Sequence, residues 1–278
     1  MAKIFNLFSI TIVIVYHVFA ETQAASTSKH TSIGSRIVGG TPARNINIPY
    51  IVSLFYFYSH HCGGSIINER TVLTAAHCLQ NSIYKYFKVH AGTKTISSSR
   101  EGIVVGVSAV HYHNMFNFKT MDYDIGLVRM VKAISYRYNI QPISLPAPYE
   151  DAVQDGDMAR VSGWGVTKPG GSASAYLRYA NVPIVNQNIC DLLHRGITDR
   201  MICAGYDNGG ADACQSDSGG PLEYDGKIVG IVSWGVSCAL PNKPGVYTRV
   251  SELIPWIQMT LANNYADSIP GGFFGKTK

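Results

Sequence analysis

Three segments of the sequence place a histidine, an acid and a serine where they could support covalent catalysis. His77 lies in residues 74–78 (TAAHC), Asp124 begins an apolar segment, and Ser218 lies in a glycine-rich loop. A serine hydroxyl needs a base to accept its proton, and the base needs an acid that fixes its tautomer and stabilises its cation. Each residue alone is more often structural than catalytic. Together, in this order, they predict His77 as general base, Asp124 as its orienting acid and Ser218 as nucleophile.

The glycines near Ser218 suit the same chemistry. Residues 209–220 (GGADACQSDSGG) contain four of them. Without a Cβ, such residues let backbone N–H groups approach a developing oxyanion. The loop could therefore supply both the nucleophile and part of the stabilisation of its transition state.

The rest of the sequence indicates a scaffold of short strands. The 278 residues are 46% hydrophobic and 15% charged, which excludes a disordered chain. Neither a glycine period nor a heptad pattern is present, so collagen-like and coiled-coil proteins are excluded as well. Apolar or alternating segments between turn residues predict an antiparallel sandwich or barrel. They comprise residues 50–58, 64–67, 71–74, 87–91, 102–111, 125–129, 158–163, 182–185, 227–233 and 245–249.

Convincing helical periodicity is confined to residues 251–263. There the apolar side chains fall on one face, Ser251 is expected as N-cap, and Pro255 lies in the first turn, where proline is tolerated. Residues 141–157 contain three prolines and an acidic end, which suits a surface connection between two half-size units. Residues 265–278 are expected to form a frayed tail.

The N-terminus predicts export. Residues 1–20 combine Lys3, an apolar stretch and a small-residue end, as in a cleavable signal peptide. The alternative is a membrane anchor, but the uninterrupted apolar run is shorter than the ~20 residues that span a bilayer. We therefore expect a soluble, secreted protein in a compartment that permits disulfides. Polar, Ser/Thr-rich residues 21–36 are expected to be a disordered, removable propeptide.

Charge and histidine patterns exclude other classes of partner. The formal net charge is +5, and Lys and Arg never form a run of five, so a nucleic-acid surface is not expected. No membrane partner is expected either. His111 and His113 could suggest zinc, but two histidines without further ligands are a weak signal. We interpret them as loop residues and expect no metal or other cofactor.

Six motifs together carry a family resemblance. They are RIVGG at 36–40, LTAAHC at 73–78, DIGL at 124–127, DACQSDSGGP at 212–221, SWG at 233–235 and NKPGVYTRV at 242–250. With them the sequence resembles the chymotrypsin-type serine peptidases, and among these the trypsins. The resemblance implies an all-β fold of two six-stranded antiparallel barrels with a C-terminal helix and the catalytic cleft between the barrels. We expect a peptidase domain at 37–264, with barrels at roughly 50–140 and 146–250 and the helix at 251–263.

The resemblance also implies how substrate is bound. The backbone N–H groups of Ser216 and Ser218 would form the oxyanion hole, although the family usually has glycine where this chain has Ser216. Asp212 would lie at the base of a pocket for Arg or Lys, with Gly235 and Gly245 as its small walls. Ala213 stands where many trypsins have serine, which favours Arg over Lys.

Activation and cross-links follow from the same resemblance. Cleavage after Arg36 would free the Ile37 ammonium to insert beside Asp217 and order the active site. The six cysteines allow many pairings, and the resemblance selects Cys62–Cys78, Cys190–Cys203 and Cys214–Cys238. Residues 93–101 (TKTISSSRE) hold a single acid where vertebrate trypsins bind calcium, so no calcium site is expected.

The predicted function is a trypsin-like serine endopeptidase made as a zymogen. It would act on protein or peptide substrates, meet protein protease inhibitors and work as a monomer. The alternative is a silent homologue that acts only by binding partners, although all three catalytic residues are present. An α/β-hydrolase esterase is excluded because it needs a G-x-S-x-G motif and the order Ser, Asp, His.

Overall fold

The computed structural model describes residues 40–96, 101–166, 173–209, 217–236 and 241–266. Backbone contacts divide the chain into Met1–Gly34 and Ser35–Lys278, and every described residue belongs to the second unit. The expected signal peptide, propeptide and most of the expected tail lie outside the described residues. Where the structure describes the chain, it contains no helix long and apolar enough to cross a membrane.

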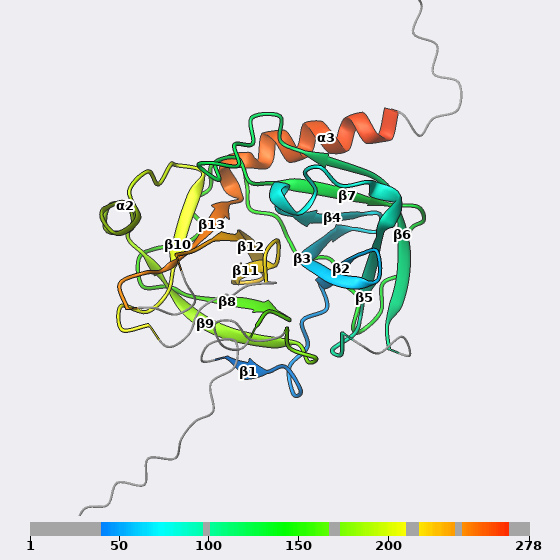
Figure 1. Cartoon of the computed structure of the whole chain (residues 1–278), viewed down its shortest axis with the longest axis horizontal. Helices are drawn as coiled ribbons and strands as arrows, with labels where there is room; N and C mark the ends of the chain where they lie inside the picture. The colour runs from blue at the N-terminus through cyan, green and yellow to red at the C-terminus, as the bar shows by residue number, and fades with distance from the viewer. Residues whose placement is uncertain (1–39, 97–100, 167–172, 210–216, 237–240, 267–278) are drawn as a thin grey trace, which may run out of the picture. The chain divides into compact units, whose positions relative to one another are not determined.

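Six strands form the first barrel. They are β2 (Ile51–Tyr56), β3 (Ser59–Asn68), β4 (Thr71–Thr74), β5 (Phe87–Ala91), β6 (Ile103–Tyr112) and β7 (Gly126–Met130). All neighbours are antiparallel, in the closed order β2-β3-β4-β7-β6-β5 (Figure 1). The alternation of apolar residues explains the closure, because inward-facing side chains such as Leu54, Ile66 and Phe87 are fully buried in one core.

A second barrel follows in the chain. Its strands are β8 (Met158–Gly163), β9 (Arg178–Val185), β10 (Met201–Ala204), β11 (Pro221–Tyr224), β12 (Lys227–Trp234) and β13 (Gly245–Arg249). The order β9-β10-β13-β12-β11-β8 closes because β8 also pairs with β9, and the short β1 (Thr41–Pro42) adds to the outside of β9. Val161, Leu222 and Tyr247 belong to its buried core. The expected fold of two six-stranded antiparallel barrels is confirmed.

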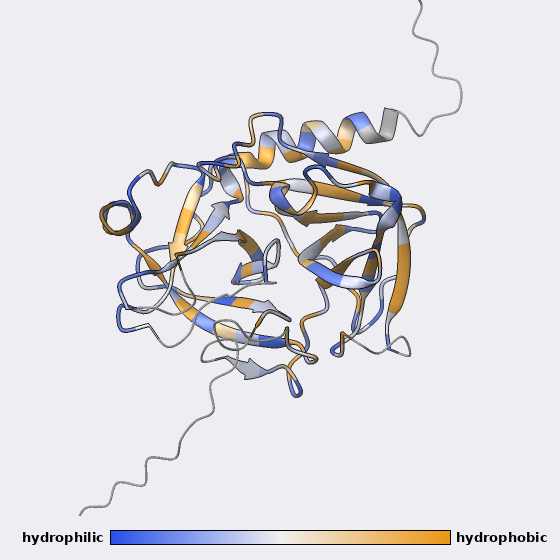
Figure 2. Ribbon diagram, in the orientation of Figure 1, coloured by the Kyte–Doolittle hydropathy of each residue, from blue (hydrophilic) through white to orange (hydrophobic). Residues whose placement is uncertain are grey.

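The C-terminal helix is present but begins later than expected. A short 3₁₀ helix, η3 (Ser251–Leu253), comes first, and α3 (Ile254–Ala266) follows it. Ser251 is therefore not the N-cap: Val250 precedes η3 and makes no side-chain cap. Pro255 does lie in the first turn of α3. Ile254 and Ile257 join the same core as first-barrel residues, and Figure 2 shows apolar colour along this helix and along the strands.

The sequence interpretation missed the helix α2 (Gln187–His194) and the strands β1, β10 and β11. It also missed two short 3₁₀ helices, η1 (Ala76–Cys78) and η2 (Tyr84–Tyr86). Residues 141–157 contain only an isolated bridge between Ser144 and Lys227, as suits a connection between the barrels. His111 lies within β6, so its interpretation as a loop residue was wrong, whereas His113 follows that strand.

Candidate active site

His77 is held by a short 3₁₀ helix, η1 (Ala76–Cys78), directly after β4. The disulfide Cys62–Cys78 ties this helix to β3. The ring nitrogen His61 Nε2 lies 3.0 Å from the Cys78 carbonyl oxygen. Thr74 Oγ1 donates to the Gly63 carbonyl at 2.8 Å. The histidine is thus fixed from both ends of η1 while its own side chain stays partly exposed.

Asp124 is fully buried and binds His77 at two points. Its Oδ1 accepts the His77 backbone N–H at 2.9 Å, and its Oδ2 lies 2.7 Å from His77 Nδ1. Because a carboxylate can only accept, the proton of a neutral imidazole belongs on Nδ1. Nε2 is then left as the acceptor, which is the state that a general base needs.

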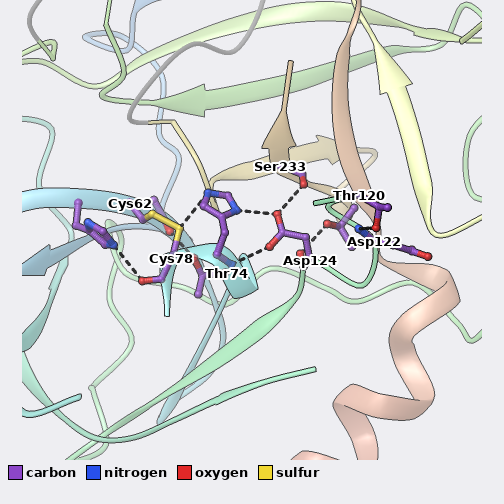
Figure 3. Close-up of polar contacts among 11 residues, drawn as sticks. Cys62, Thr74, Cys78, Thr120, Asp122, Asp124 and Ser233 are labelled. Atoms are coloured by element: carbon purple, nitrogen blue, oxygen red, sulfur yellow. Dashed lines mark hydrogen bonds and ion pairs between the residues drawn. A yellow bond between two sulfur atoms is a disulfide. The ribbon is translucent and has the colours of Figure 1, made fainter. Parts of the chain in front are cut away.

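Two hydroxyl groups of the second barrel complete the contacts of Asp124. Ser233 Oγ donates to Asp124 Oδ2 at 2.6 Å, and Thr248 Oγ1 donates to the Asp124 carbonyl oxygen at 2.7 Å. His77, Asp124 and Ser233 therefore form a hydrogen-bonded triad, and Figure 3 shows Ser233 beside the aspartate, away from the Cys62–Cys78 disulfide. The sequence interpretation included Ser233 and Thr248 in motifs but missed the contacts of both residues with Asp124.

Ser218 is half-buried where the two barrels meet. Its carbonyl oxygen accepts the Gly63 N–H at 2.8 Å, and the next residue, Gly219, donates its N–H to the Val232 carbonyl at 2.8 Å. Gly219 has a φ of +79°, and a Cβ there would overlap Thr74 Oγ1. The Ser218 segment therefore lies against the residues that lead to His77 on one side and against the strand of Ser233 on the other.

Asp217 is fully buried, and its carboxylate lies against the end of β8. The backbone N–H of Gly165 donates to its Oδ1 at 2.7 Å. A Cβ at Gly163 or at Gly165 would overlap this carboxylate. The two glycines of residues 162–165 (SGWG) therefore make room for Asp217, a role that the sequence analysis did not anticipate.

The expected substrate pocket is described only in part. Trp234 pairs with Val246 across β12 and β13, so the adjoining Gly235 and Gly245 lie close together at one end of this strand pair. Gly245 is buried and Gly235 is exposed. Asp212, Ser216, Arg36 and Ile37 lie outside the described residues.

Two of the implied disulfides are present. Besides Cys62–Cys78, the structure joins Cys190 in α2 to Cys203 in β10. Cys214 and Cys238 lie outside the described residues. Among those the structure does describe, the one group with metal-ligand spacing is Cys62, His77 and Cys78, and both sulfurs are already joined to each other.

Comparisons with known proteins agree with this geometry. A family model described as Trypsin matches residues 37–257. Trypsin of Simulium vittatum is 44% identical over 239 residues, which cover 82% of this chain and 94% of that protein. Trypsin II-P29 of Gallus gallus is 41% identical over 230 residues, with 82% and 90% covered. The vitellin-degrading protease of Bombyx mori is 37% identical over 243 residues, with 86% and 91% covered. These matches, the two closed barrels and the hydrogen bonds that join His77, Asp124 and Ser233 show that the chain belongs to the trypsin family of serine endopeptidases.

Proposed function

We propose that this serine endopeptidase is a secreted zymogen that, once cleaved after Arg36, hydrolyses peptide bonds following Arg or Lys. The observation that supports the proposed catalytic activity is the pair of hydrogen bonds that joins His77 to the buried Asp124. This pair makes Nε2 a proton acceptor and stabilises the imidazolium that forms when it accepts. Its substrates are proteins, and protein inhibitors would compete for the same cleft. We further propose that the peptidase domain spans 37–264 and acts as a monomer.

The proposed mechanism uses Ser218 as nucleophile. Its Oγ bonds to the scissile carbonyl carbon while its proton passes to His77 Nε2. The amine then leaves with that proton, and an acyl-enzyme ester remains. Water attacks the ester, again losing a proton to His77, and the acid product and the Ser218 hydroxyl are released.

The contacts of Ser233 argue against it as the nucleophile. Its hydroxyl donates to the same Asp124 oxygen that faces His77 Nδ1, whereas a nucleophile must give its proton to Nε2. The test compares Ser218→Ala with Ser233→Ala, using a phosphonate that labels activated serines and mass mapping of the labelled peptide. We expect label on Ser218 that Ser218→Ala abolishes. Label on Ser233 would reverse the assignment, and a folded, cleaved wild-type enzyme that takes no label would favour the silent homologue.

Primary specificity is proposed to come from Asp212. A carboxylate at the base of the pocket would pair with Arg or Lys, and the small Gly235 and Gly245 would admit the long side chain. Cleavage of peptides bearing Arg, Lys, Phe or Leu tests this. We expect Arg to exceed Lys because Ala213 supplies no hydroxyl. Asp212→Ser should remove the preference for basic residues, and a Lys rate equal to or above the Arg rate would contradict the role of Ala213.

Zymogen activation is proposed to act through Asp217. A buried carboxylate is unfavourable without a compensating charge, and the Ile37 ammonium freed by cleavage would provide one. An Arg36→Gln precursor should remain inactive after trypsin treatment, whereas the wild-type precursor should gain activity. N-terminal sequencing of the exported and the activated protein tests the proposed signal peptide and the start at Ile37. Activity of the Arg36→Gln precursor would show that this cleavage is not required.

Ser216 is proposed to shape the oxyanion hole with Ser218. Its N–H would still donate to the oxyanion, but its side chain would crowd the site. One lost donor in such a hole costs about 3–4 kcal/mol, so even a partial displacement should be measurable. Ser216→Gly is expected to change turnover and the affinity for protein inhibitors. Unchanged values for both would remove this role.

A further inference from the structure

The turn that leads into Asp124 has an unfavourable backbone conformation. Met121 and Tyr123 both have φ of 57°, in the left-handed region that residues with a Cβ seldom occupy. The Tyr123 carbonyl accepts the Ile125 N–H at 2.8 Å, so the chain reverses sharply around Asp124. We call residues 121–124 the acid turn. Such a conformation persists only where surrounding contacts hold it.

An ion pair from the second barrel holds the acid turn. Arg200 donates from Nε to Asp122 Oδ1 at 2.9 Å and from Nη2 to Oδ2 at 2.8 Å. Thr198 Oγ1 and the Tyr123 backbone N–H also donate to Oδ1, at 3.0 and 2.9 Å. Burial would raise the pKa of Asp122, but the hydrogen bonds from Arg200 and Thr198 outweigh it and lower the pKa. The carboxylate is therefore ionised, and the bidentate pair is charge-assisted.

The same arginine contacts the aromatic ring of the acid turn. The Arg200 guanidinium lies 4.5 Å from the centre of the Tyr123 ring, within cation–π range. Tyr123 also stacks on His113, with ring centres 4.5 Å apart and planes 24° apart. His113 in turn lies 5.4 Å from the ring of Trp256 in α3. Arg200 thus contacts both the Asp122 carboxylate and the Tyr123 ring, which belong to the two residues directly before Asp124.

These contacts cross the molecule. Asp122 precedes β7 of the first barrel, whereas Thr198 and Arg200 lie between α2 and β10, next to the second barrel. Figure 3 shows Asp122 on the side of Asp124 that faces away from the Cys62–Cys78 disulfide. The hydroxyls of Ser233 and Thr248 contact the side chain and the carbonyl oxygen of Asp124, whereas Arg200 contacts the two residues that precede it. The acid turn is also held from its N-terminal side, where Met121 N–H donates to the Asn117 carbonyl at 2.7 Å and Asn117 N–H donates to the Asp122 carbonyl at 3.1 Å. Arg200 adds the contact from the other barrel, to the Asp122 carboxylate and the Tyr123 ring.

We propose that Arg200 is a positioning residue for the catalytic acid. By clamping the acid turn across the two barrels, it keeps the Asp124 carboxylate directed at His77. This inference rests on the proposed roles of His77 and Asp124. It predicts a defect in turnover rather than in substrate binding, because the clamp lies on the far side of Asp124 from His77.

The test compares four variants by kcat, KM and active-site titration. Arg200→Gln should lower kcat by about 10- to 100-fold, because a misplacement of about 1 Å near the chemistry can cost about 100-fold. KM should stay within about twofold. Arg200→Lys should recover part of the loss, because it keeps the charge but not the bidentate geometry. Asp122→Asn should resemble Arg200→Gln, and the double variant should be no worse than either single one.

A matched control separates positioning from general stability. Arg160 also pairs with an acid, Glu223 at 3.4 Å, and also lies over a tyrosine ring, Tyr179 at 5.8 Å, but it joins strands within the second barrel. Arg160→Gln should leave kcat unchanged. If the wild-type enzyme is active and Arg200→Gln has the same kcat as Arg160→Gln, the inference fails while the proposed function stands. If Arg200→Gln does not fold, Asp122→Asn decides by the same criterion, and wild-type enzyme without activity would instead refute the proposed function.

Discussion

Replacement of Gly165 by alanine tests whether room for the Asp217 carboxylate is essential. The Gly165 N–H donates to Asp217 Oδ1 at 2.7 Å, and a Cβ on Gly165 would overlap the carboxylate. Asp217 is fully buried, so it cannot move into water. Either the carboxylate or the chain at 165 must shift, and the charged hydrogen bond is then lost.

The magnitude follows from two contributions. Loss of a hydrogen bond to a charged group costs about 1.5–3 kcal/mol, and overpacking of a buried site costs about 1–3 kcal/mol. Together they should lower the free energy of unfolding by at least about 2.5 kcal/mol. For a domain of this size that corresponds to a fall in Tm of about 5–10 °C. Because Ser218 follows Asp217 directly, kcat/KM should fall at least about 100-fold.

Gly106→Ala is the matched control, since a Cβ at Gly106 would meet no atom closer than 3.6 Å. We expect its free energy of unfolding within about 0.5 kcal/mol of wild type. Thermal unfolding and titrated activity of the two variants provide the comparison. A Gly165→Ala protein with the Tm and kcat/KM of Gly106→Ala would refute the reasoning.

Two further predictions concern the triad and pH. Ser233→Ala should lower the free energy of unfolding in urea by about 1.5–3 kcal/mol, because it removes a 2.6 Å bond to a buried carboxylate; a loss below about 0.5 kcal/mol would show that this bond is unimportant. Burial lowers the pKa of three histidines from the usual 6.5, so below that pH the unfolded chain binds more protons than the folded one. These histidines are His90, His113 and His194. The free energy of unfolding should therefore fall as pH drops from about 7 to 5, and replacing each histidine by glutamine should make this fall smaller. A free energy of unfolding that does not change over this pH range would contradict the lowered pKa values.

The barrel strands were predictable where apolar residues recur between turn formers, and the missed strands show the limit. The four residues of β10 (MICA) are all buried, so they show no alternation that would distinguish a strand from any short apolar run. The four residues of β11 begin with Pro221, which is a common turn residue but is tolerated at the first position of a strand. Both strands exist because neighbouring strands supply their partners, which local sequence does not encode.

The candidate site divides in the same way. His77 and Asp124 lie in distinctive local motifs, so the sequence alone predicts their pairing. Arg200 and Asp122 are 78 residues apart and show no shared local pattern. Such contacts depend on how the two barrels meet, which is why residues that support the site emerged only from the structure.

The helix α2, which the sequence interpretation missed, tests whether its N-cap residue alone determines where a helix begins. Of its residues only Cys190 is buried, while Ile189 and Leu192 are 51% and 81% exposed, so its apolar residues mark no core-facing stripe. Its start is nevertheless encoded, because the Asn186 side chain accepts the N–H groups of Asn188 and Ile189 at 3.0 and 3.2 Å. Asn186→Ala should lower the free energy of urea unfolding by about 1 kcal/mol, whereas Asn186→Ser, which keeps an acceptor, should lose only a few tenths. Equal losses for the two variants would mean that the Cys190–Cys203 disulfide and tertiary packing, rather than the cap, determine where α2 begins.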